Sequence, residues 1–383
     1  MKGKKLKSIL SLAFVVIFVL SAFALIFIKS SSINSSAMSL TSAKSMCVME
    51  TSSKRVLYNK SDDKILPMAS TTKIITAITA IENCNDLDAK FEVSPKSIGI
   101  SGTSLYLREG EVFSVRDLLY GLMLVSGNDA SVAIANRVGG SEKQFVNLMN
   151  ETARKIGAFN SHFDNPHGLD SKTHYTTAYD LALITSYALN NPIFSEIVST
   201  KNTKIINQDG KTRYLRNKNK LLHTMQGCIG VKTGFTDDAG RCLVSACERD
   251  GMKVVCVVLN CGPMFEESKS LLNKAFDEYK LVDLTQNYCY EKTIPVVDGK
   301  KDYVNVGTKQ HFFYPLKEQE LKTVKYDYCL AKSVEAPVNI DEEVGEIKIY
   351  IDKNLHFSEK IYTMESVRRK SIWAKVKTMI DKW

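Results

Sequence analysis

The chain has 383 residues, of which 44% are hydrophobic and 24% charged, an ordinary composition for a folded protein with one large and one smaller domain. Its formal net charge is +9. The basic residues responsible gather at the two ends, and residues 31–365 are close to neutral. We therefore expect no nucleic-acid partner, because no basic surface is left on the body of the chain.

The first 37 residues are predicted to direct the chain out of the cytoplasm. Lysines precede an uncharged stretch, Ser8 to Ile28, that is rich in Phe, Val, Ile and Leu. A basic segment followed by an apolar one is typical of a secretory signal. Ser35-Ser36-Ala37 offers a cleavage site, although the apolar stretch is also long enough for an uncut membrane segment. In both cases the remainder is expected at the outer face of a bacterial cell membrane, in the cell-wall space.

Residues 38–280 are predicted to form one mixed domain in which strands, helices and strands follow in turn. Strands at 45–50 and 55–59 precede a helix from Ser70 that is apolar on nearly every side and should be buried. The order predicts an α/β (α+β) fold, with an antiparallel sheet built from both ends of the domain and a helical insertion between them. Helices are expected at 115–125, 130–137, 141–156, 178–189 and 266–279, and later strands at 204–206, 213–215, 228–233, 242–247 and 254–259.

The rest of the chain is predicted to form a small all-β domain and a terminal helix. Short β-rich pieces alternate with Gly- and Asp-containing turns over residues 281–362. A helix is expected over residues 363–383, because the apolar side chains from Ile372 to Trp383 fall on one helical face and basic ones occupy the rest. A basic amphipathic helix with Trp373 and Trp383 is typical of an anchor that lies on the membrane surface. The alternative is an ordinary surface helix packed on the β domain.

The cysteines do not indicate a metal site. The chain has nine, an odd number, and none shows C-x-x-C spacing. The chain also lacks a P-loop, a Rossmann glycine pattern after a strand and an H-E-x-x-H motif. We therefore expect neither a metal nor a cofactor. Five cysteines in apolar strand-like stretches are interpreted as small core residues, namely Cys228, Cys242, Cys247, Cys256 and Cys261.

Three short motifs carry candidate chemistry. In the first, Ser70-Thr71-Thr72-Lys73, the serine would open a helix near the positive end of its dipole, with Lys73 one turn later on the same face. Burial and a second nearby cation favour a neutral lysine, which can take the serine proton. Ser126-Gly127-Asn128 is a polar turn between two helices. Lys232-Thr233-Gly234 lies on a strand, where its side chains offer donors to a carboxylate and Gly234 allows close approach of a ligand backbone.

Each motif alone is weak evidence. S-x-x-K is frequent by chance, and both Ser70 and the S-x-N turn could simply cap helices. Together and in this order, however, S-x-x-K, S-x-N and K-T-G form the set found in penicillin-recognising serine enzymes.

With the motifs in place, residues 40–265 resemble the low-molecular-mass penicillin-binding proteins, which are serine-type D-alanyl-D-alanine carboxypeptidases. The β domain and the terminal helix match the domain arrangement of this family more than its amino-acid sequence. The likeness outside the motifs lies in the stretches Leu66–Ala69, Asn165–Asp170, Tyr179–Ala182, Lys232–Thr236 and Ala239–Val244.

The resemblance implies removal of the terminal D-alanine from peptidoglycan stem pentapeptides that end in D-Ala-D-Ala, as part of cell-wall biogenesis. It implies that Ser70 forms an acyl-enzyme, that Lys73 is the general base and that Ser126 relays a proton to the leaving amine. β-Lactam antibiotics would then be covalent inhibitors. The substrate-binding positions implied are Asn128, Lys232, Thr233, Gly234 and Phe235, whose backbone N–H would share the oxyanion hole with that of Ser70.

Three further residues have no assigned role. Some members of the family carry arginines that bind the terminal carboxylate, and this chain offers Lys218 and Lys253 instead, which give charge without bidentate geometry. His167 borders the site, and a structural hydrogen bond in its loop is at least as good an explanation as a catalytic role.

Two other functions share these motifs. A class A β-lactamase also needs a glutamate after the S-x-N motif, but no glutamate lies between Glu151 and Glu196, and S-G-N replaces S-D-N. A penicillin sensor or wall-binding protein with an inactive site is the non-enzymatic alternative. The intact set of three motifs argues against it.

Overall fold

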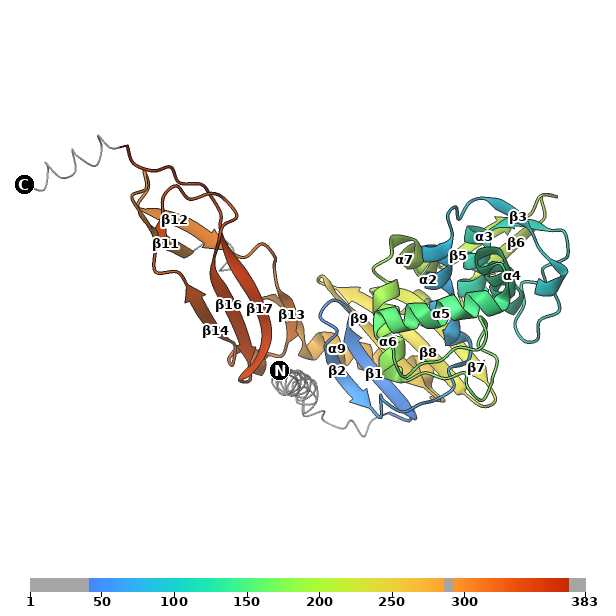
Figure 1. Cartoon of the computed structure of the whole chain (residues 1–383). Coiled ribbons are helices and arrows are strands. Elements are labelled where there is room, and N and C mark those ends of the chain that lie inside the picture. Colours follow the sequence, from blue (N-terminus) through green and yellow to red (C-terminus); the bar gives the residue numbers. More distant parts are fainter. Residues whose placement is uncertain (1–40, 286–291, 372–383) are drawn as a thin grey trace, which may run out of the picture. The chain divides into compact units, whose positions relative to one another are not determined.

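The first part of the protein is a mixed domain built on a five-stranded antiparallel sheet. The computed structural model describes residues 41–285 and 292–371. The strand order is β2-β1-β9-β8-β7, so the N-terminal hairpin β1-β2 joins the later strands through the pairing of β1 with β9 (Figure 1). This confirms the predicted fold class. The bounds are β1 Ser45–Glu50, β2 Val56–Lys60, β7 Cys228–Thr236, β8 Gly240–Arg249 and β9 Met252–Leu259.

Helices cover both faces of this sheet. Every residue of β1 is buried, which requires cover on both sides, and both α6 (Ala178–Ala188) and α9 (Met264–Glu278) contact it. The helical insertion between β2 and β7 contains the helices predicted before residue 190, and the helix predicted at 266–279 is α9. The insertion also contains α7 and α8, which the sequence pattern did not reveal. The remaining bounds are α3 Val115–Tyr120, a π-helical turn Gly121–Val125, α4 Asn128–Gly139, α5 Glu142–Ile156, α7 Pro192–Ser199 and α8 Lys220–Thr224.

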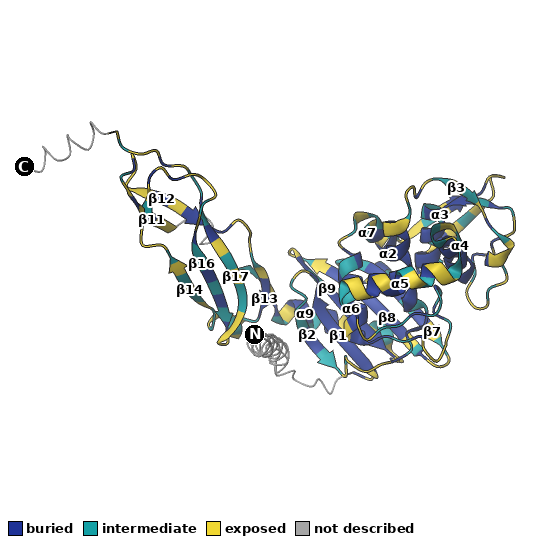
Figure 2. Ribbon diagram, viewed as in Figure 1, coloured by how far each residue is buried: buried dark blue, intermediate teal, exposed yellow. Residues whose placement is uncertain are grey.

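The central helix α2, Lys73–Asn83, is buried from Lys73 to Ile81, as the sequence predicts (Figure 2). It packs against α4, α5 and α6. A short 3₁₀ helix, Ala69–Thr72, comes immediately before it. Ser70 therefore lies in this 3₁₀ turn, one turn ahead of the α-helix that it was expected to open. Two short hairpins complete the domain: β3 Lys90–Glu92 with β4 Val112–Ser114, and the predicted pair β5 Asn202–Ile206 with β6 Thr212–Arg216.

The C-terminal part is all-β, as predicted. A six-stranded sheet has the order β14-β16-β17-β12-β11-β15, and β10 pairs with β13. Alternating residues such as Ile347 and Ile349 of β16 turn inwards and form a separate core with Val304 and Val306. The strands are β10 Lys280–Asp283, β11 Lys292–Val297, β12 Tyr303–Gly307, β13 Phe313–Leu316, β14 Lys325–Leu330, β15 Val334–Glu335, β16 Glu343–Ile351 and β17 Asn354–Thr363, with a short helix α10 at Glu318–Leu321.

The prediction of a helix over residues 363–383 is wrong for the residues that can be compared. Residues 364–371 are not helical, and Val367 forms a β-bridge to Val338 while Arg369 bridges to Gly299. The reason is packing, because Val367 is buried in the core of the β domain. The predicted export segment, residues 1–37, and the rest of the predicted anchor lie outside the described residues. Within 41–285 and 292–371, no helix has the length and apolar character needed to cross a membrane.

Candidate active site

The turn that carries Ser70 is held from two sides. Thr71 and Thr72 donate their hydroxyls to the carbonyls of Met68 and Ala69, which fixes the 3₁₀ turn from within. Strand β7 lies against its outside. A Cβ built on Gly234 would come within 3.0 Å of the Met68 carbonyl oxygen and 3.1 Å of the Ser70 nitrogen. Glycine at this position therefore lets the K-T-G strand approach the backbone of the serine.

Lys73 is the most completely enclosed group of the site. Its side chain is fully buried, and its Nζ lies 2.9 Å from the Ser70 Oγ. Two oxygens that can only accept hydrogen bonds also contact Nζ, namely Asn128 Oδ1 at 2.7 Å and the His167 carbonyl at 2.6 Å. A neutral amine has two N–H bonds and one lone pair. If the two oxygens take the two N–H bonds, the lone pair is directed at the hydroxyl proton of Ser70.

The charges around Lys73 favour this neutral form. Burial, followed by the positive charges of Lys232 and Lys218, lowers the pKa of Lys73 well below its usual value, while the carboxylate of Asp129 opposes the shift. Lys232 is buried too, and burial together with Lys218 lowers its pKa to about 7. A lysine whose pKa is lowered in this way can act as a base at lower pH than a free lysine.

The S-G-N turn brings Ser126 and Asn128 to the same place. Ser126 adopts a left-handed backbone conformation with φ of 71° between the π-helical turn and α4, and its buried hydroxyl has no hydrogen-bond partner among the described residues. The Asn128 amide spans the site, since its Oδ1 faces Lys73 and its Nδ2 donates to the Ser101 carbonyl. The hydrogen-bonding capacity of the Ser126 hydroxyl is therefore not used by any described residue.

A buried carboxylate next to this motif was missed from the sequence. Asp129 is 1% exposed. Its Oδ2 accepts hydrogen bonds from Ser104 Oγ at 2.6 Å and Leu107 N at 3.0 Å. Its Oδ1 accepts from the backbone nitrogens of Leu105 and Ala130, both at 2.9 Å. Asp129 thus ties the loop 101–107 to the start of α4, directly beside Asn128. An acidic residue after S-x-N is the only sequence signal, and it is weak alone.

Asn in place of Asp129 is expected to loosen this loop and to shift the pH dependence. The amide nitrogen cannot accept a hydrogen bond, so at least one buried N–H loses its partner, at about 1–3 kcal/mol in the free energy of unfolding. Loss of the negative charge also removes the influence that raises the pKa of Lys73. The acidic limb of the kcat/KM profile should therefore move to lower pH. Urea unfolding and a pH–rate profile measure the two effects.

Ser104→Ala is the matched control for Asp129→Asn. It removes one hydrogen bond to the same carboxylate but keeps the charge. An acidic limb that moves equally in both variants, or in neither, would show that the charge of Asp129 does not act on Lys73.

The K-T-G motif lies on β7, at the edge of the sheet. Lys232 is buried behind the strand surface, and its Nζ is 3.0 Å from the Thr233 carbonyl oxygen. The ring of Phe235, by contrast, is 63% exposed and lines the cleft. The strand thus presents Thr233 and Phe235 towards solvent-accessible space, with the charge of Lys232 behind them.

The loop that contains His167 packs against Lys73. The His167 backbone carbonyl contacts Lys73, and the His167 ring Nδ1 accepts a hydrogen bond from Leu169 N. Burial and the nearby Lys73 lower the pKa of His167 to about 3, so the ring is neutral at physiological pH. Gly168 has φ of +89°, and a Cβ there would fall 2.0 Å from the Ala69 carbonyl oxygen. His167 thus serves the site through its backbone and a structural hydrogen bond, and Gly168 allows the loop to reach the serine turn.

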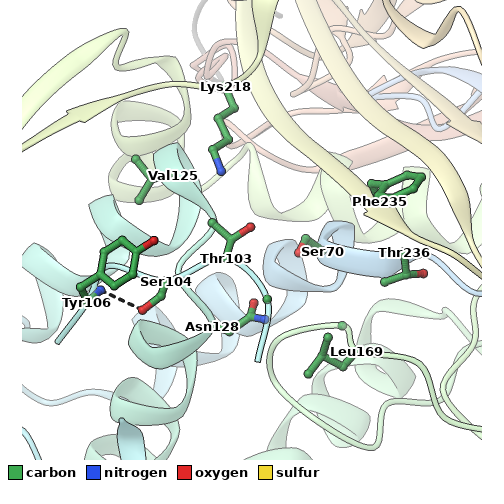
Figure 3. Close-up of a pocket in the computed structure, with 12 residues that line it drawn as sticks. Ser70, Thr103, Ser104, Tyr106, Val125, Asn128, Leu169, Lys218, Phe235 and Thr236 are labelled. Carbon is green, nitrogen blue, oxygen red and sulfur yellow. Dashed lines mark hydrogen bonds between the residues drawn. The ribbon is translucent and has the colours of Figure 1, made fainter. Parts of the chain in front are cut away.

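A cleft of about 670 Å³ opens over Ser70. Figure 3 shows Tyr106, Ser104 and Lys218 on one side of Ser70, and Phe235 and Thr236 on the other. Of the predicted site residues, Ser70, Asn128 and Phe235 line the cleft, whereas Lys73, Lys232 and Ser126 are buried around it.

Lys218 and Lys253, the two candidate cations for the terminal carboxylate, differ in their position relative to the cleft. Lys218 lines the cleft with Ser70, and its backbone N–H is anchored to the Leu124 carbonyl. Lys253 lies on β9, where it pairs with Glu248 at 3.6 Å, and it does not line the cleft. Lys218 is therefore the better placed cation for a ligand carboxylate. Within the described ranges, no cluster of three or more histidine, cysteine or acidic side chains could hold a metal ion.

Comparisons with known proteins agree with this geometry. The sequence model of the D-alanyl-D-alanine carboxypeptidase family (peptidase S11) matches residues 32–262, and that of the C-terminal domain of penicillin-binding protein 5 matches residues 276–369. D-alanyl-D-alanine carboxypeptidase DacF of Bacillus subtilis is 28% identical over 89% of this chain and 90% of its own. DacD of Escherichia coli is 31% identical over 76% and 74%.

A solved structure shares the fold over most of the chain. Penicillin-binding protein 5 of Haemophilus influenzae superposes with a TM-score of 0.71 and 25% identity, covering 86% of this chain and 98% of its own. The matched regions include all three motifs and both folded parts. The chain therefore belongs to the D-alanyl-D-alanine carboxypeptidase family of serine peptidases.

Proposed function

We propose that Ser70 is the nucleophile with which this carboxypeptidase removes the last D-alanine from peptidoglycan stem peptides. Its Oγ attacks the carbonyl between the two D-alanines, the C–N bond breaks, and the last D-alanine leaves as the free amino acid. Water then hydrolyses the acyl-enzyme and releases the shortened peptide. The observation that carries this proposal is the 2.9 Å contact between Ser70 Oγ and the fully buried Lys73.

Lys73 is the proposed base for the first step. It takes the Ser70 proton through the lone pair that Asn128 and His167 leave unused. The departing amine then needs a proton. The Ser126 hydroxyl, which is buried and without a partner among the described residues, is the proposed relay from Lys73 to that nitrogen.

The oxyanion hole is assigned to the backbone N–H groups of Ser70 and Phe235. Support comes from the close packing of Gly234 on the serine turn, which brings the two backbones together. Loss of one such donor typically costs about 10²–10³ in rate. β-Lactams present a carbonyl to the same donors, so we expect penicillin to acylate Ser70.

The terminal carboxylate is proposed to bind between Thr233 and two lysines. Lys232 supplies charge from behind the K-T-G strand, and Lys218 supplies it from the wall of the cleft. Burial lowers the pKa of both lysines, so a ligand carboxylate beside them would stabilise their charged forms.

Replacing Lys218 with methionine should weaken substrate binding more than chemistry. Loss of a hydrogen bond to a charged group corresponds to about a 10- to 100-fold lower kcat/KM, and most of it should appear in KM. Arginine at this position should restore activity, whereas Lys253→Met should leave it unchanged. Steady-state release of D-alanine measures all three variants. Equal effects at 218 and 253 would contradict the assignment.

The chain is proposed to act outside the cell membrane, with residues 38–280 as the peptidase domain and 281–362 as the β domain. Surface attachment is proposed for residues from 372 onwards, because Trp373 and Trp383 lie among basic residues there. Flotation of residues 38–383 with anionic vesicles, compared with residues 38–371, tests attachment in the absence of the apolar N-terminal segment. Equal recovery of both chains with the vesicles would contradict it.

The deciding experiment combines turnover with active-site labelling. The chain is incubated with a peptide ending in Lys-D-Ala-D-Ala, and free D-alanine is measured after titration with penicillin. We expect release to fall in proportion to covalent labelling, with the label on the peptide that contains Ser70. A protein that is labelled by penicillin but releases no D-alanine before treatment would favour a penicillin sensor. Label elsewhere, or turnover that penicillin does not affect, would contradict the proposal.

A further inference from the structure

Two cysteines face each other at the start of the strand that carries the K-T-G motif. Cys228 is the first residue of β7, and its register partner on β8 is Cys247. Both are thiols in the structure. Partners in register point to the same face of a sheet, so the two side chains are neighbours. Among the described strands, no other two cysteines are register partners.

The position within the ladder is the one at which a disulfide fits. The hydrogen bond from Glu248 N to the Gly227 carbonyl, 2.8 Å long, belongs to the adjacent pair of residues. Cys228 and Cys247 are therefore a non-hydrogen-bonded pair, in which Cα atoms are about 4.5 Å apart and side chains approach most closely. That separation is at the short end of the range that disulfides span. The register shift directly after Cys228 gives its backbone room to adjust.

The surroundings give the two thiols different reactivity. Cys228 is half-buried, and its contact with the Cys247 thiol lowers its pKa, with a further contribution from the charge of Lys201. Cys247 is buried, with the Met225 sulfur 3.7 Å away, and its contact with Cys228 together with burial raises its pKa. A partly accessible thiol beside a fully buried one is the arrangement of an attacking and a resolving cysteine.

We propose that Cys228 and Cys247 form an intramolecular disulfide by exchange with an external disulfide. The Cys228 thiolate attacks one sulfur of the oxidant, and the other sulfur leaves as a thiol. Cys247 then gives up its proton and attacks the Cys228 Sγ of the mixed disulfide, which releases the second thiol. Two cysteine thiols are oxidised and one external disulfide is reduced, so that atoms and electrons balance.

The bond would link β8 to Cys228, the first residue of β7, which lies four positions before Lys232. Because β7 is an edge strand, β8 is its sole strand partner in the five-stranded sheet. A covalent link there limits fraying of the K-T-G strand from its N-terminal end. Oxidation should therefore raise the midpoint of thermal unfolding, and it leaves Ser70 and Lys73 untouched.

The test treats the full chain with oxidised glutathione and maps its cysteines by mass spectrometry. We expect a cross-linked pair of peptides that contain Cys228 and Cys247, two hydrogen atoms lighter than their reduced sum, and a higher thermal midpoint that dithiothreitol reverses. Cys247→Ser should stop at a stable mixed disulfide between glutathione and Cys228. Cys228→Ser should leave Cys247 reduced.

Cys329→Ser is the matched control, because it removes an exposed cysteine on β14 and should not alter the cross-link. A wild-type chain in which Cys228 keeps glutathione would overturn the proposal, since Cys247 would then be unable to resolve the mixed disulfide. A chain in which both cysteines stay reduced would overturn it as well.

Discussion

Alanine in place of Ser70 will abolish both D-alanine release and covalent labelling by penicillin. The change removes one oxygen atom from a 3₁₀ turn whose other hydrogen bonds come from Thr71 and Thr72, so the fold should persist. Removal of the nucleophile from a serine hydrolase costs on the order of 10⁴–10⁶ in kcat. Release of D-alanine from a Lys-D-Ala-D-Ala peptide, with mass spectrometry of the penicillin-treated protein, measures the loss.

Thermal unfolding provides the control for Ser70→Ala. An unchanged midpoint would show that the loss is chemical. Turnover above about one hundredth of the wild-type rate in a folded variant, or penicillin still attached to the peptide around position 70, would mean that another group is the nucleophile.

Methionine in place of Lys73 will leave the serine in place but unactivated. Methionine fills a similar volume and cannot accept the proton, so we expect acylation to slow on the order of 10⁴-fold. The pH dependence should change too. In the wild type the neutral fraction of Lys73 grows as the pH rises through its pKa, and kcat/KM should rise with it. That limb should be absent from the variant.

Stopped-flow acylation by a chromogenic β-lactam, measured across pH, separates this effect from binding. Lys96→Met, at an exposed lysine outside the cleft, is the control for loss of one positive charge. If the Lys73→Met variant retained the rising limb, its origin would lie in another group, and Lys232, with a pKa of about 7, would be the first to examine.

The contact between Ser70 and Lys73 was predictable because it depends on a short spacing. Lys73 follows Ser70 by one turn in any helix-like conformation, so their contact is local and survives the change from an α-helix to a 3₁₀ turn. The buried helix and the order of strands were likewise visible as apolar patterns, since each depends on periodicity within a single segment.

The parts that escaped prediction depend on contacts between distant segments. The carbonyl of His167 reaches Lys73 only because the loop folds under the serine turn, and a backbone atom carries no sequence signal. Asp129 looks like any acidic residue in the first turn of a helix until the loop 101–107 lies beside it. Near the C-terminus, the apolar pattern that predicted a helix starts only at Ile372, and the residues before it pair with the β domain, where Val367 is buried in the core.

The pairing of β1 with β9 limits how early during synthesis the peptidase domain can fold. Ser45 lies opposite Leu259, so the sheet cannot close until almost the whole peptidase domain has been synthesised. Such long-range pairing slows folding, because a large loop must close before the contact is gained. The K-T-G strand β7 pairs only with β8 in that sheet, and both strands lie in the part of the domain that is synthesised last. A nascent chain therefore carries Ser70 and Lys73 long before the K-T-G strand can lie beside them, so the complete candidate site forms only when the sheet closes.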